Sequence, residues 1–257
     1  MKVASWNINS INARLHHVCN WLEEHKPDFL FLQELKSQEE NFPYAALEDL
    51  GYKAHAVCQK SYNGVAILTP HNDATIIDTT LPGDKEDEQA RFINVSYKNV
   101  SYINIYLPNG NGEEEKYLYK LKWMERLFQY SRNLLDNDSN FVVGGDFNVI
   151  PTPEDCYNVN AWLDDALYRL PTRQAFRKFL HAGLTDAFRV FNKDPNQYTF
   201  WDYQAGRWPK DEGIRIDHFL TSPKITDRLK NCLIDRAPRG KEKASDHTPI
   251  IIEFDDE

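Results

Sequence analysis

The stretch FVVGGDFNVIP, residues 141–151, runs from an apolar segment into two glycines, a carboxylate and a carboxamide. Its first residues are typical of a buried β-strand. Gly, Asp and Asn tolerate tight backbone geometry, so Asp146 and Asn148 could simply form the turn that follows. The end of a buried strand is also a rigid support for chemical groups. The polar residues in the rest of the chain decide between these two interpretations.

The chain as a whole has the composition of a folded globular protein. It has 257 residues, of which 41% are hydrophobic and 27% are charged. This length suits one large domain with a substantial core, so we expect a single domain over residues 1–257. No segment approaches a membrane span. The N-terminal segment MKVASWNINS has no apolar core of signal-peptide length, so we expect cytoplasmic residence.

Cysteine spacing and net charge exclude some classes of function. The four cysteines are far apart and form no CxxC pair, which argues against a zinc knuckle or redox motif and predicts reduced thiols. The net charge of −9 argues against a protein that coats polyanions non-specifically. We interpret the basic segment 224–243 as a solvated face of mixed charge. A local basic surface remains compatible with this charge, and its candidate residues are Arg173, Arg177, Lys178, Arg207 and Lys210.

Short apolar or alternating runs bounded by Gly, Pro, Asn or Asp recur along the chain and predict β-strands. Apolar residues at three- and four-residue steps predict a helix from Ile11 to just before Pro27, with Ser10 as its N-cap. Two further helices are expected at about 113–136 and 172–181. Strands outnumber helices and do not alternate with them, which favours packed β-sheets with helices outside. The predicted strands are 2–6, 28–33, 64–68, 101–108, 141–145, 217–222 and 249–254.

Six of these elements carry polar side chains at their ends. Each residue alone is more simply explained by a turn or an ordinary sheet position, but their joint occurrence favours a site. Glu34 is the most unusual, because a carboxylate directly after the apolar run FLFLQ needs a partner or a metal. The residues are Asn7, Asn9, Gln33, Glu34, Lys36, Tyr106, Asn109, Asp146, Asn148, Arg215, Asp217, His218, Ser245, Asp246 and His247.

This set of residues favours metal-assisted phosphoester hydrolysis. Oxygen donors predominate, which suits Mg2+ held by one or two carboxylates together with waters and substrate phosphate. A zinc site would need clusters of His or Cys. The chain has no P-loop, and the GNG of residues 110–112 is too short for a dinucleotide-binding fingerprint. An Asp, a His and a Mg2+ ion around a phosphate describe hydrolysis of a phosphoester.

Seven motifs resemble the exonuclease III family of apurinic/apyrimidinic endonucleases, within the endonuclease/exonuclease/phosphatase superfamily. They are WNINS, LQELK, YLPNG, GGDFNV, YTFWDY, GIRIDHFL and SDHTPI, in family order over nearly the whole chain. The resemblance implies a four-layer α/β sandwich of two packed, mainly antiparallel β-sheets flanked by helices. It also implies Mg2+-dependent cleavage of the phosphodiester 5′ to an abasic site in double-stranded DNA. Related activities would be 3′-to-5′ exonuclease and removal of 3′-blocking groups, with Mn2+ able to substitute and the protein acting as a monomer.

The resemblance implies a metal site whose principal ligand is Glu34. Lys36 would tune the metal carboxylates, and Asn109 would support the loop that follows Tyr106. The other residues at or near the metal would be Asn7, Asn9, Asp146, Asn148, Asp246 and His247. The residues that bind substrate would be Lys36, Asn109, Phe200, Trp201, Trp208, Ile214 and Ile216.

The resemblance further implies a set of catalytic residues. Asp146 would align or deprotonate the attacking water, and Asn148 would hold the phosphate. His247, oriented and kept cationic by Asp217, would stabilise charge on the phosphate. Tyr106 would touch the phosphate or assist the leaving oxygen.

Two features of the chain depart from some members of the family. Ile214 lies where some relatives carry tryptophan, in an apolar slot for the extruded sugar that would also include Phe200, Trp201 and Ile216. The loops that some relatives insert into bent DNA here read GNGEEE and QAGRWPKDEG. We expect one residue of the second loop to act as a wedge between base steps, the candidates being Gln204, Arg207 and Trp208.

The main alternative is a phosphatase or phosphodiesterase of the same superfamily that acts on a non-DNA phosphoester. Such relatives share the Glu, Asp-x-Asn and Ser-Asp-His motifs, but the lipid and inositol phosphatases and deoxyribonuclease I typically have histidine where this chain has Tyr106. The motifs LQELK and YTFWDY also favour the DNA enzyme. A scaffold that had lost activity would lack at least one polar group of the site, and none is missing.

Overall fold

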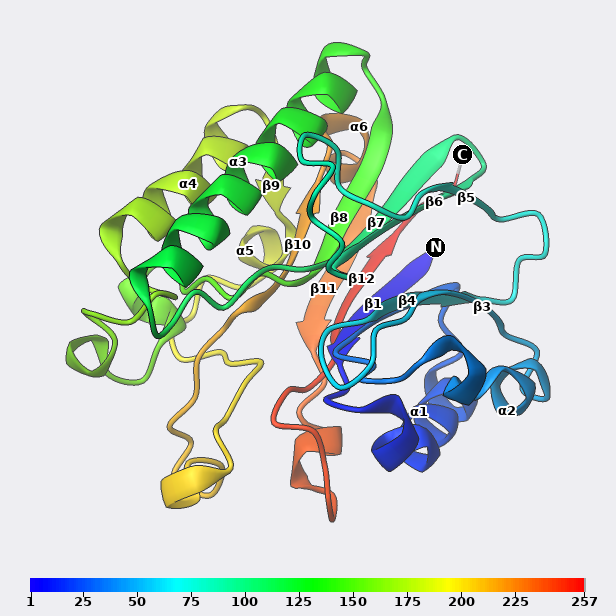
Figure 1. Ribbon diagram of the computed structural model, residues 1–257, viewed down its shortest axis with the longest axis horizontal. Coiled ribbons are helices and arrows are strands. Elements are labelled where there is room, and N and C mark those ends of the chain that lie inside the picture. The colour runs from blue at the N-terminus through cyan, green and yellow to red at the C-terminus, as the bar shows by residue number, and fades with distance from the viewer. Residues whose placement is uncertain (257) are drawn as a thin grey trace.

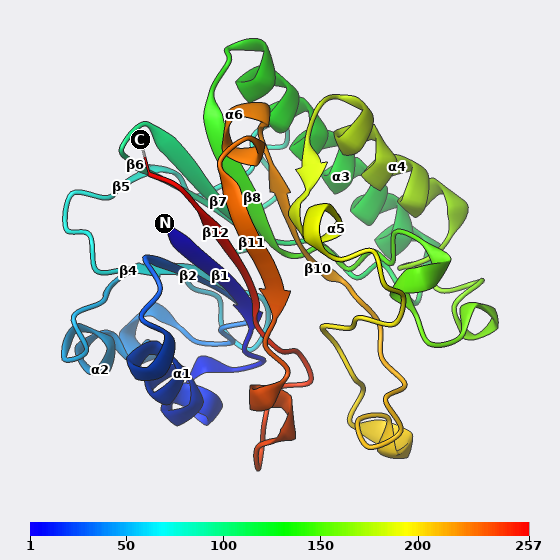
Figure 2. The same ribbon diagram turned by 180° about the vertical axis from the view of Figure 1, so that it is seen from behind.

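The computed structural model describes residues 1–256 and contains two six-stranded β-sheets packed face to face (Figures 1 and 2). The first sheet has, in spatial order, β11 (Leu229–Ile234), β12 (Ile250–Phe254), β1 (Lys2–Asn7), β2 (Phe29–Gln33), β4 (Val65–Thr69) and β3 (Lys53–Val57). The second has β5 (Thr75–Asp78), β6 (Phe92–Tyr97), β7 (Val100–Tyr106), β8 (Asn140–Asp146), β10 (Asp217–Thr221) and β9 (Thr185–Asp186).

Helices cover the outer face of each sheet and complete the four layers. The long helices are α1 (Ile11–His25), α3 (Glu114–Asp136) and α4 (Leu170–His181), and the short ones are α2 (Tyr44–Glu48), α5 (Ala187–Phe191) and α6 (Pro223–Thr226). Helices α1 and α2 lie on the side of the first sheet, and α3 and α4 on the side of the second (Figure 1). Short 3₁₀ turns occupy Glu39–Asn41, Pro153–Asp155, Val159–Ala161, Gln204–Gly206 and Ala237–Gly240.

The three predicted helices are confirmed. The side chain of Ser10 accepts a hydrogen bond from the backbone N–H of Ala13 at 3.4 Å, which is the expected N-cap of α1. That helix ends at Lys26, in the left-handed conformation, directly before Pro27. Helix α4 begins at Leu170, two residues before the expected start, because Pro171 is well accommodated in a first helical turn.

Each sheet contains one parallel pair of strands. Strands β1 and β2 are parallel and joined by α1, and β7 and β8 are parallel and joined by α3. The other neighbours in both sheets pair antiparallel, which confirms the expected mainly antiparallel sandwich. Because parallel strands end at the same edge, the residues that follow them are brought together.

The core between the sheets explains the continuous apolar strands. All five residues of β2, FLFLQ, are buried, because one face meets the second sheet and the other meets α1. Across the interface Phe29 stacks on Tyr102 with ring centroids 3.8 Å apart. Glu34, the next residue after this buried strand, therefore emerges at the edge of the core.

Several strands were not among those predicted, namely β3, β5, β6, β9 and β11. Strand β5 lies at a sheet edge and is largely exposed, so its sequence lacks the alternation that marks a half-buried strand. Strand β11 lies inside the basic segment 224–243. Cations of that segment pair with acids, including Lys230 with Asp255 at 2.7 Å and Arg236 with Asp211 at 2.6 Å. This agrees with a solvated face of mixed charge.

Two further features of the structure concern the cysteines and the length of apolar helices. All four cysteines lie within the described residues and are free thiols, as predicted. Among residues 1–256, no helix combines the length and apolar character that crossing a bilayer requires.

Candidate active site

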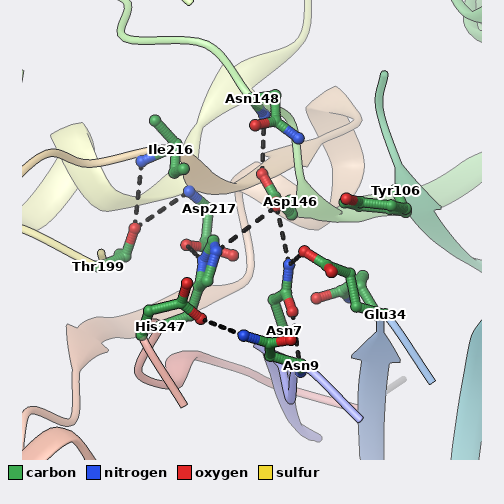
Figure 3. Close-up of polar contacts among 12 residues, drawn as sticks. Asn7, Asn9, Glu34, Tyr106, Asp146, Asn148, Thr199, Ile216, Asp217 and His247 are labelled. Carbon is green, nitrogen blue, oxygen red and sulfur yellow. Dashed lines mark hydrogen bonds and ion pairs between the residues drawn. The ribbon is translucent and has the colours of Figure 1, made fainter. Parts of the chain in front are cut away.

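Strand register brings the predicted polar residues together at one end of the sandwich (Figure 3). Asp146, the last residue of β8, pairs with Tyr106 of β7 on one side and with Asp217 of β10 on the other. The first sheet contributes Asn7 at the end of β1 and Glu34 just after β2. Both sheets therefore supply carboxylates to the same site.

Two carboxylates and an imidazole form a possible metal centre. Ligand atoms of Glu34, Asp146 and His247 all lie within 4.8 Å of one another. The side-chain amide of Asn7 donates to Glu34 Oε1 at 2.8 Å and to Asp146 Oδ2 at 3.0 Å. Asn7 thus links the carboxylates of the two sheets, and oxygen donors of this kind suit a hard divalent cation.

The carboxylate of Glu34 is held in its charged form. Burial alone would raise its pKa, but the ammonium of Lys36, 2.8 Å from Oε2, and the amide of Asn7 outweigh burial and lower the pKa below its usual value. Glu34 and Lys36 both have left-handed backbone conformations, with φ of 53° and 50°. Such a conformation costs about 1–3 kcal/mol for a residue other than glycine and is typical of functional sites.

A second layer of polar residues surrounds Asn7 and Glu34. Asn9 donates from its side chain to Asp246 Oδ1 at 3.1 Å and accepts from Lys36 Nζ at 2.6 Å. Ser245 donates to the backbone oxygen of Asn7 at 2.6 Å. Asn9 and Asp246 therefore lie beside the carboxylate cluster, as expected, although neither belongs to its three closest ligand groups.

His247 lies between two buried carboxylates. Its Nδ1 is 2.8 Å from Asp217 Oδ2, and its Nε2 is 3.7 Å from Asp146 Oδ2. Burial alone would lower the pKa of His247, but Asp217 and then Asp146 raise it well above its usual value, so the imidazole is cationic. Burial raises the pKa of Asp146, and the nearby charge of His247 partly offsets this. Asp217 is completely buried behind the imidazole.

Asn148 is fixed by hydrogen bonds within its own turn and to the loop after β7. Its backbone N–H donates to Asp146 Oδ1 at 2.8 Å, and its side-chain amide donates to the backbone oxygen of Leu107 at 2.9 Å. Its side-chain oxygen accepts from the amide of Asn109 at 3.2 Å. With φ of 48°, Asn148 also makes the tight turn that Gly, Asp and Asn permit. Both initial interpretations of residues 141–151 therefore hold.

The phenol of Tyr106 borders the same cluster. Burial, followed by the charges of Glu34 and Asp146, raises its pKa well above the usual value, so the group is a protonated hydrogen-bond donor. The guanidinium of Arg91 lies 4.8 Å from the centre of the Tyr106 ring and donates to the Tyr106 backbone oxygen at 3.1 Å. Sequence analysis did not identify Arg91, because no local pattern places it over this ring.

Arg215 and His218, two of the polar strand-end residues, belong to a separate buried network. Arg215 Nε is 2.7 Å from Asp155 Oδ1, and its Nη2 is 2.8 Å from Asp186 Oδ2. Its Nη1 is 3.0 Å from His218 Nδ1, while His218 Nε2 contacts the backbone oxygen of Val149 at 2.9 Å. Burial and then Arg215 lower the pKa of His218 to about 4, so this imidazole is neutral. The network supports the strand that carries Asp217.

A pocket with both polar and apolar lining lies beside Phe200, which contacts the imidazole of His247. The ring of Phe200 lies 4.9 Å from that of His247. Phe200 and Ile214 line a pocket of about 220 Å3 together with Tyr157 and Trp162. Trp201 and Ile216, also expected to line this slot, do not belong to its lining. In an extended segment, neighbouring side chains point to opposite faces, so Phe200 and Trp201 cannot both face the pocket.

The candidate wedge residues are held in different ways. Trp208 packs edge to face on Trp201, with ring centroids 4.8 Å apart, and the guanidinium groups of Arg236 and Arg239 lie 5.4 and 5.5 Å from its ring. Trp208 is therefore an anchored side chain in this conformation. Arg207 forms an ion pair with Glu212 and lies over Tyr157. Gln204 is the exposed member of the three.

Four of the five residues of the expected basic surface make contacts within the protein. The Nζ of Lys178 is 2.9 Å from Glu125 Oε2, and Arg207 is paired as described above. Arg173 lies over the ring of Tyr168 at 4.4 Å and donates to that residue's backbone oxygen. Lys210 donates to a backbone oxygen in its own loop. The ion pairs of Lys178 and Arg207 reduce the positive charge that the predicted surface can offer to a polyanion, whereas the contacts of Arg173 and Lys210 leave their charges in place.

Comparison with known proteins agrees with this geometry. A model of the Endonuclease/Exonuclease/phosphatase family matches residues 4–247. The chain belongs to this family. Exodeoxyribonuclease III of Haemophilus influenzae is 34% identical to this family member. The alignment has 267 positions and covers 99% of this chain and 100% of the relative.

Solved structures of the family are similar over the whole chain. An AP endonuclease from Archaeoglobus fulgidus is 35% identical, with a TM-score of 0.94 and 99% of each chain covered. A 3′-5′ exonuclease from Neisseria meningitidis is 37% identical, with a TM-score of 0.93, covering 99% of this chain and 100% of the other. The resemblance stated from the seven motifs is therefore confirmed at the level of family, fold and nuclease class.

Proposed function

We propose that this family member is a Mg2+-dependent DNA repair nuclease that hydrolyses the phosphodiester 5′ to an abasic site in double-stranded DNA. The proposal includes 3′-to-5′ exonuclease activity and removal of 3′-blocking groups. The observation that carries it is the convergence of Glu34, Asp146 and His247, with Asp217 behind the imidazole and Tyr106 beside the carboxylates. The names of the relatives, which include exodeoxyribonuclease III and AP endonuclease, support the same class of activity.

The donor atoms of the site fit Mg2+. Glu34 would be the principal ligand because it is charged and partly exposed, and Asp146 lies within reach of the same ion. Asn7, Asn9 and Asp246 would orient these carboxylates or hold coordinated water. A bound Mg2+ supplies Lewis-acid polarisation of a phosphoryl oxygen. Mn2+ accepts the same oxygen ligands, so we expect it to substitute.

Asp146 and His247 would handle the proton and the charge of the reaction. The raised pKa of Asp146 places it in the range where a carboxylate can accept a proton from the attacking water. His247, kept cationic by Asp217, would hold a phosphate oxygen through Nε2 and oppose the charge that develops there. These roles need no rearrangement, because both side chains already face the same space.

Tyr106 and Asn148 would position the phosphate. The protonated phenol of Tyr106 can donate to a phosphate oxygen or to the leaving oxygen. The amide nitrogen of Asn148 uses one N–H for the backbone oxygen of Leu107, which leaves its second N–H for substrate. Fixed donors of this kind favour the transition state because they are oriented before the reaction begins.

The pocket beside Phe200 supports selection of a nucleotide without a base. Its volume of about 220 Å3 suits an extruded sugar better than a sugar with its base, and its lining combines Phe200 and Ile214 with the charged residues Asp202, Arg207 and Glu212. Extrusion also costs least where the base is already missing.

The exposed Gln204 is the candidate wedge that needs the least rearrangement, whereas Trp208 would have to leave its contacts with Trp201. We further propose that the protein acts as a monomer in the cytoplasm.

One assay tests the proposal directly. A duplex with a single tetrahydrofuran abasic analogue is incubated with the wild type or with Asp146→Asn, in Mg2+ or in EDTA. We expect incision 5′ to the analogue only for the wild type in Mg2+, with loss of at least about 100-fold in rate for the variant, as for removal of a general base. Thermal unfolding checks that the variant remains folded. Absence of Mg2+-dependent incision, with phosphate release from inositol phosphates instead, would reverse the assignment of substrate.

A further inference from the structure

A buried lysine lies directly behind the site, on the helix that crosses over between β7 and β8. Lys120 in α3 is completely buried. Its Nζ donates to the backbone oxygen of Asn109 at 2.9 Å and to the backbone oxygen of Asn148 at 2.6 Å. The ammonium group therefore connects the loop after β7 with the turn after β8.

Lys120 is an exception on its helix. The buried positions of α3 are otherwise occupied by Tyr117, Trp123, Met124, Leu127 and Ser131, so Lys120 is the charged residue among them. Burial of an ammonium group is costly unless strong acceptors surround it. The two backbone carbonyls meet that need, and an apolar side chain at this position would leave both of them without this donor. The lysine therefore ties α3 to the two segments that carry Asn109 and Asn148.

The two carbonyls belong to residues whose side chains meet over the site. The amide of Asn109 donates to the side-chain oxygen of Asn148 at 3.2 Å, and the backbone N–H of Asn148 donates to Asp146. Lys120 therefore holds both members of this amide pair by their main chains. It fixes where the free N–H of Asn148 points, and it fixes the turn that supports Asp146.

The chain is shaped around the lysine stem. Gly110, next to Asn109, has a φ of +86°, and a Cβ on it would lie 2.7 Å from Cδ of Lys120. Only glycine can pass at this distance without displacing the side chain. The loop conformation and the lysine therefore depend on each other.

We propose that Lys120 is a positioning residue for phosphodiester cleavage, acting through the paired amides of Asn109 and Asn148. The identity of the substrate in this proposal rests on the proposed function, whereas the positioning of Asn109 and Asn148 by Lys120 does not. Loss of Lys120 frees two carbonyls and lets the Asn148 turn relax, while the surface that contacts DNA is unchanged. The effect should fall on kcat and leave KM nearly as it is, because the misplaced group acts in the transition state.

The test compares Lys120→Met with Lys120→Arg, and uses Lys122→Met as a matched control on the exposed face of the same helix. On the abasic duplex we expect kcat to fall at least about 10-fold for Lys120→Met. Lys120→Arg keeps N–H donors, so its kcat should be partly restored. The control Lys122→Met should have the kcat of the wild type. In the double variant with Asn148→Ala, the two effects should not add, because the lysine acts through that residue.

Side-chain amide resonances provide a readout that is independent of substrate. In 1H–15N spectra of the protein without DNA, Lys120→Met should shift the Asn109 and Asn148 amide signals, and Lys122→Met should not. If the wild type cleaves no DNA, the proposed function fails, and these spectra still decide the role of Lys120. Unchanged amide signals together with wild-type kcat, or fully additive effects with Asn148→Ala, overturn the inference.

A second variant covers the case in which Lys120→Met does not fold. Gly110→Ala lies in a loop and pushes the lysine stem away from its carbonyls. We expect it to lower kcat and to shift the same two amide signals. Wild-type kcat and spectra in Gly110→Ala would overturn the inference without any substitution in the helix.

Discussion

Replacement of Asp217 by Asn should make catalysis depend on pH in a way that the wild type does not. Asp217 Oδ2 lies 2.8 Å from His247 Nδ1, and both residues are at most 3% exposed. Burial alone would lower the pKa of His247, and Asp217 is the first of the charges that raise it to about 10. Asn keeps the shape and can still accept the Nδ1–H bond, so the substitution removes mainly the charge.

The magnitude follows from the geometry of the pair. Breaking a buried ion pair costs about 3–5 kcal/mol, and one pKa unit corresponds to about 1.36 kcal/mol. The pKa of His247 should therefore fall by roughly 2 to 4, which brings it from about 10 into the neutral range. Above the lowered pKa the imidazole is neutral and cannot oppose charge on the phosphate. A pKa of about 6 to 8 leaves between about one hundredth and one half of the imidazole cationic at pH 8, so we expect kcat at that pH to fall by about 2- to 100-fold.

The sign of the pH dependence separates this explanation from simple damage to the fold. A histidine with a lowered pKa is still protonated at low pH, so the variant should lose activity as the pH rises through that value. The ratio of wild-type to variant kcat should be smallest near pH 6 and should rise up to pH 9, where the wild-type imidazole is still mostly cationic. Protonation of Asp146 does not cancel from the ratio, because Asp217 is one of the charges that raise the pKa of Asp146, so the alkaline side of the profile is the diagnostic part.

The assay is single-turnover incision of the abasic-analogue duplex at saturating Mg2+, from pH 6 to pH 9. Asp227→Asn, at an exposed position, is the matched control and should behave as the wild type. An NMR titration of the His247 ring in protein without DNA gives its pKa directly. A variant with wild-type kcat at pH 8, or a ratio that does not change with pH, would refute the reasoning.

Two further substitutions test the neighbouring charges. Lys36→Met removes a cation that lowers the pKa of Glu34, so the acid limb of the kcat/KM profile should move to higher pH, and an unmoved limb would exclude this role. Arg215→Met leaves buried Asp186 without its ion-pair partner and Asp155 with Arg189 alone, and it should lower the free energy of unfolding in urea by about 3–5 kcal/mol. The exposed pair of Arg132 with Asp136 gives the control, since Arg132→Met should cost under about 0.5 kcal/mol.

Local sequence patterns predicted the long helices and the buried strands, because each pattern reflects which side chains of an element face the core. Apolar periodicity located α1, α3 and α4, since a helix buries residues three and four apart wherever it lies. The run FLFLQ identified a strand buried on both faces, and residues 141–145 were correctly predicted as a strand, although Gly144 and Gly145 lie within β8 and the turn follows at Asn148. Edge strands such as β5 were missed, because an exposed strand needs no regular apolar pattern.

Family resemblance predicted the residues of the site, and the structure brings most of them together. Glu34, Asp146 and His247 converge as expected, with Asp217 and Tyr106 adjacent. The apolar slot was only partly predicted. Which of two neighbouring side chains faces a pocket depends on the packing around the segment, and here Phe200 faces it while Trp201 does not.

The sequence by itself determined seven of the twelve described strands, the three long helices and the set of polar groups at the strand ends. Tertiary structure alone decided the partners of buried charges. Lys120 lies in a helix with many charged residues, and its sequence neighbours do not set it apart. Its Nζ gains two backbone acceptors, Asn109 and Asn148, only because segments 11 and 28 residues away in the chain approach it in the fold. Arg91 likewise reaches the Tyr106 ring through strand pairing. The physical reason is that a buried charge is stabilised by atoms that the fold brings to it, and these lie far from it in the sequence.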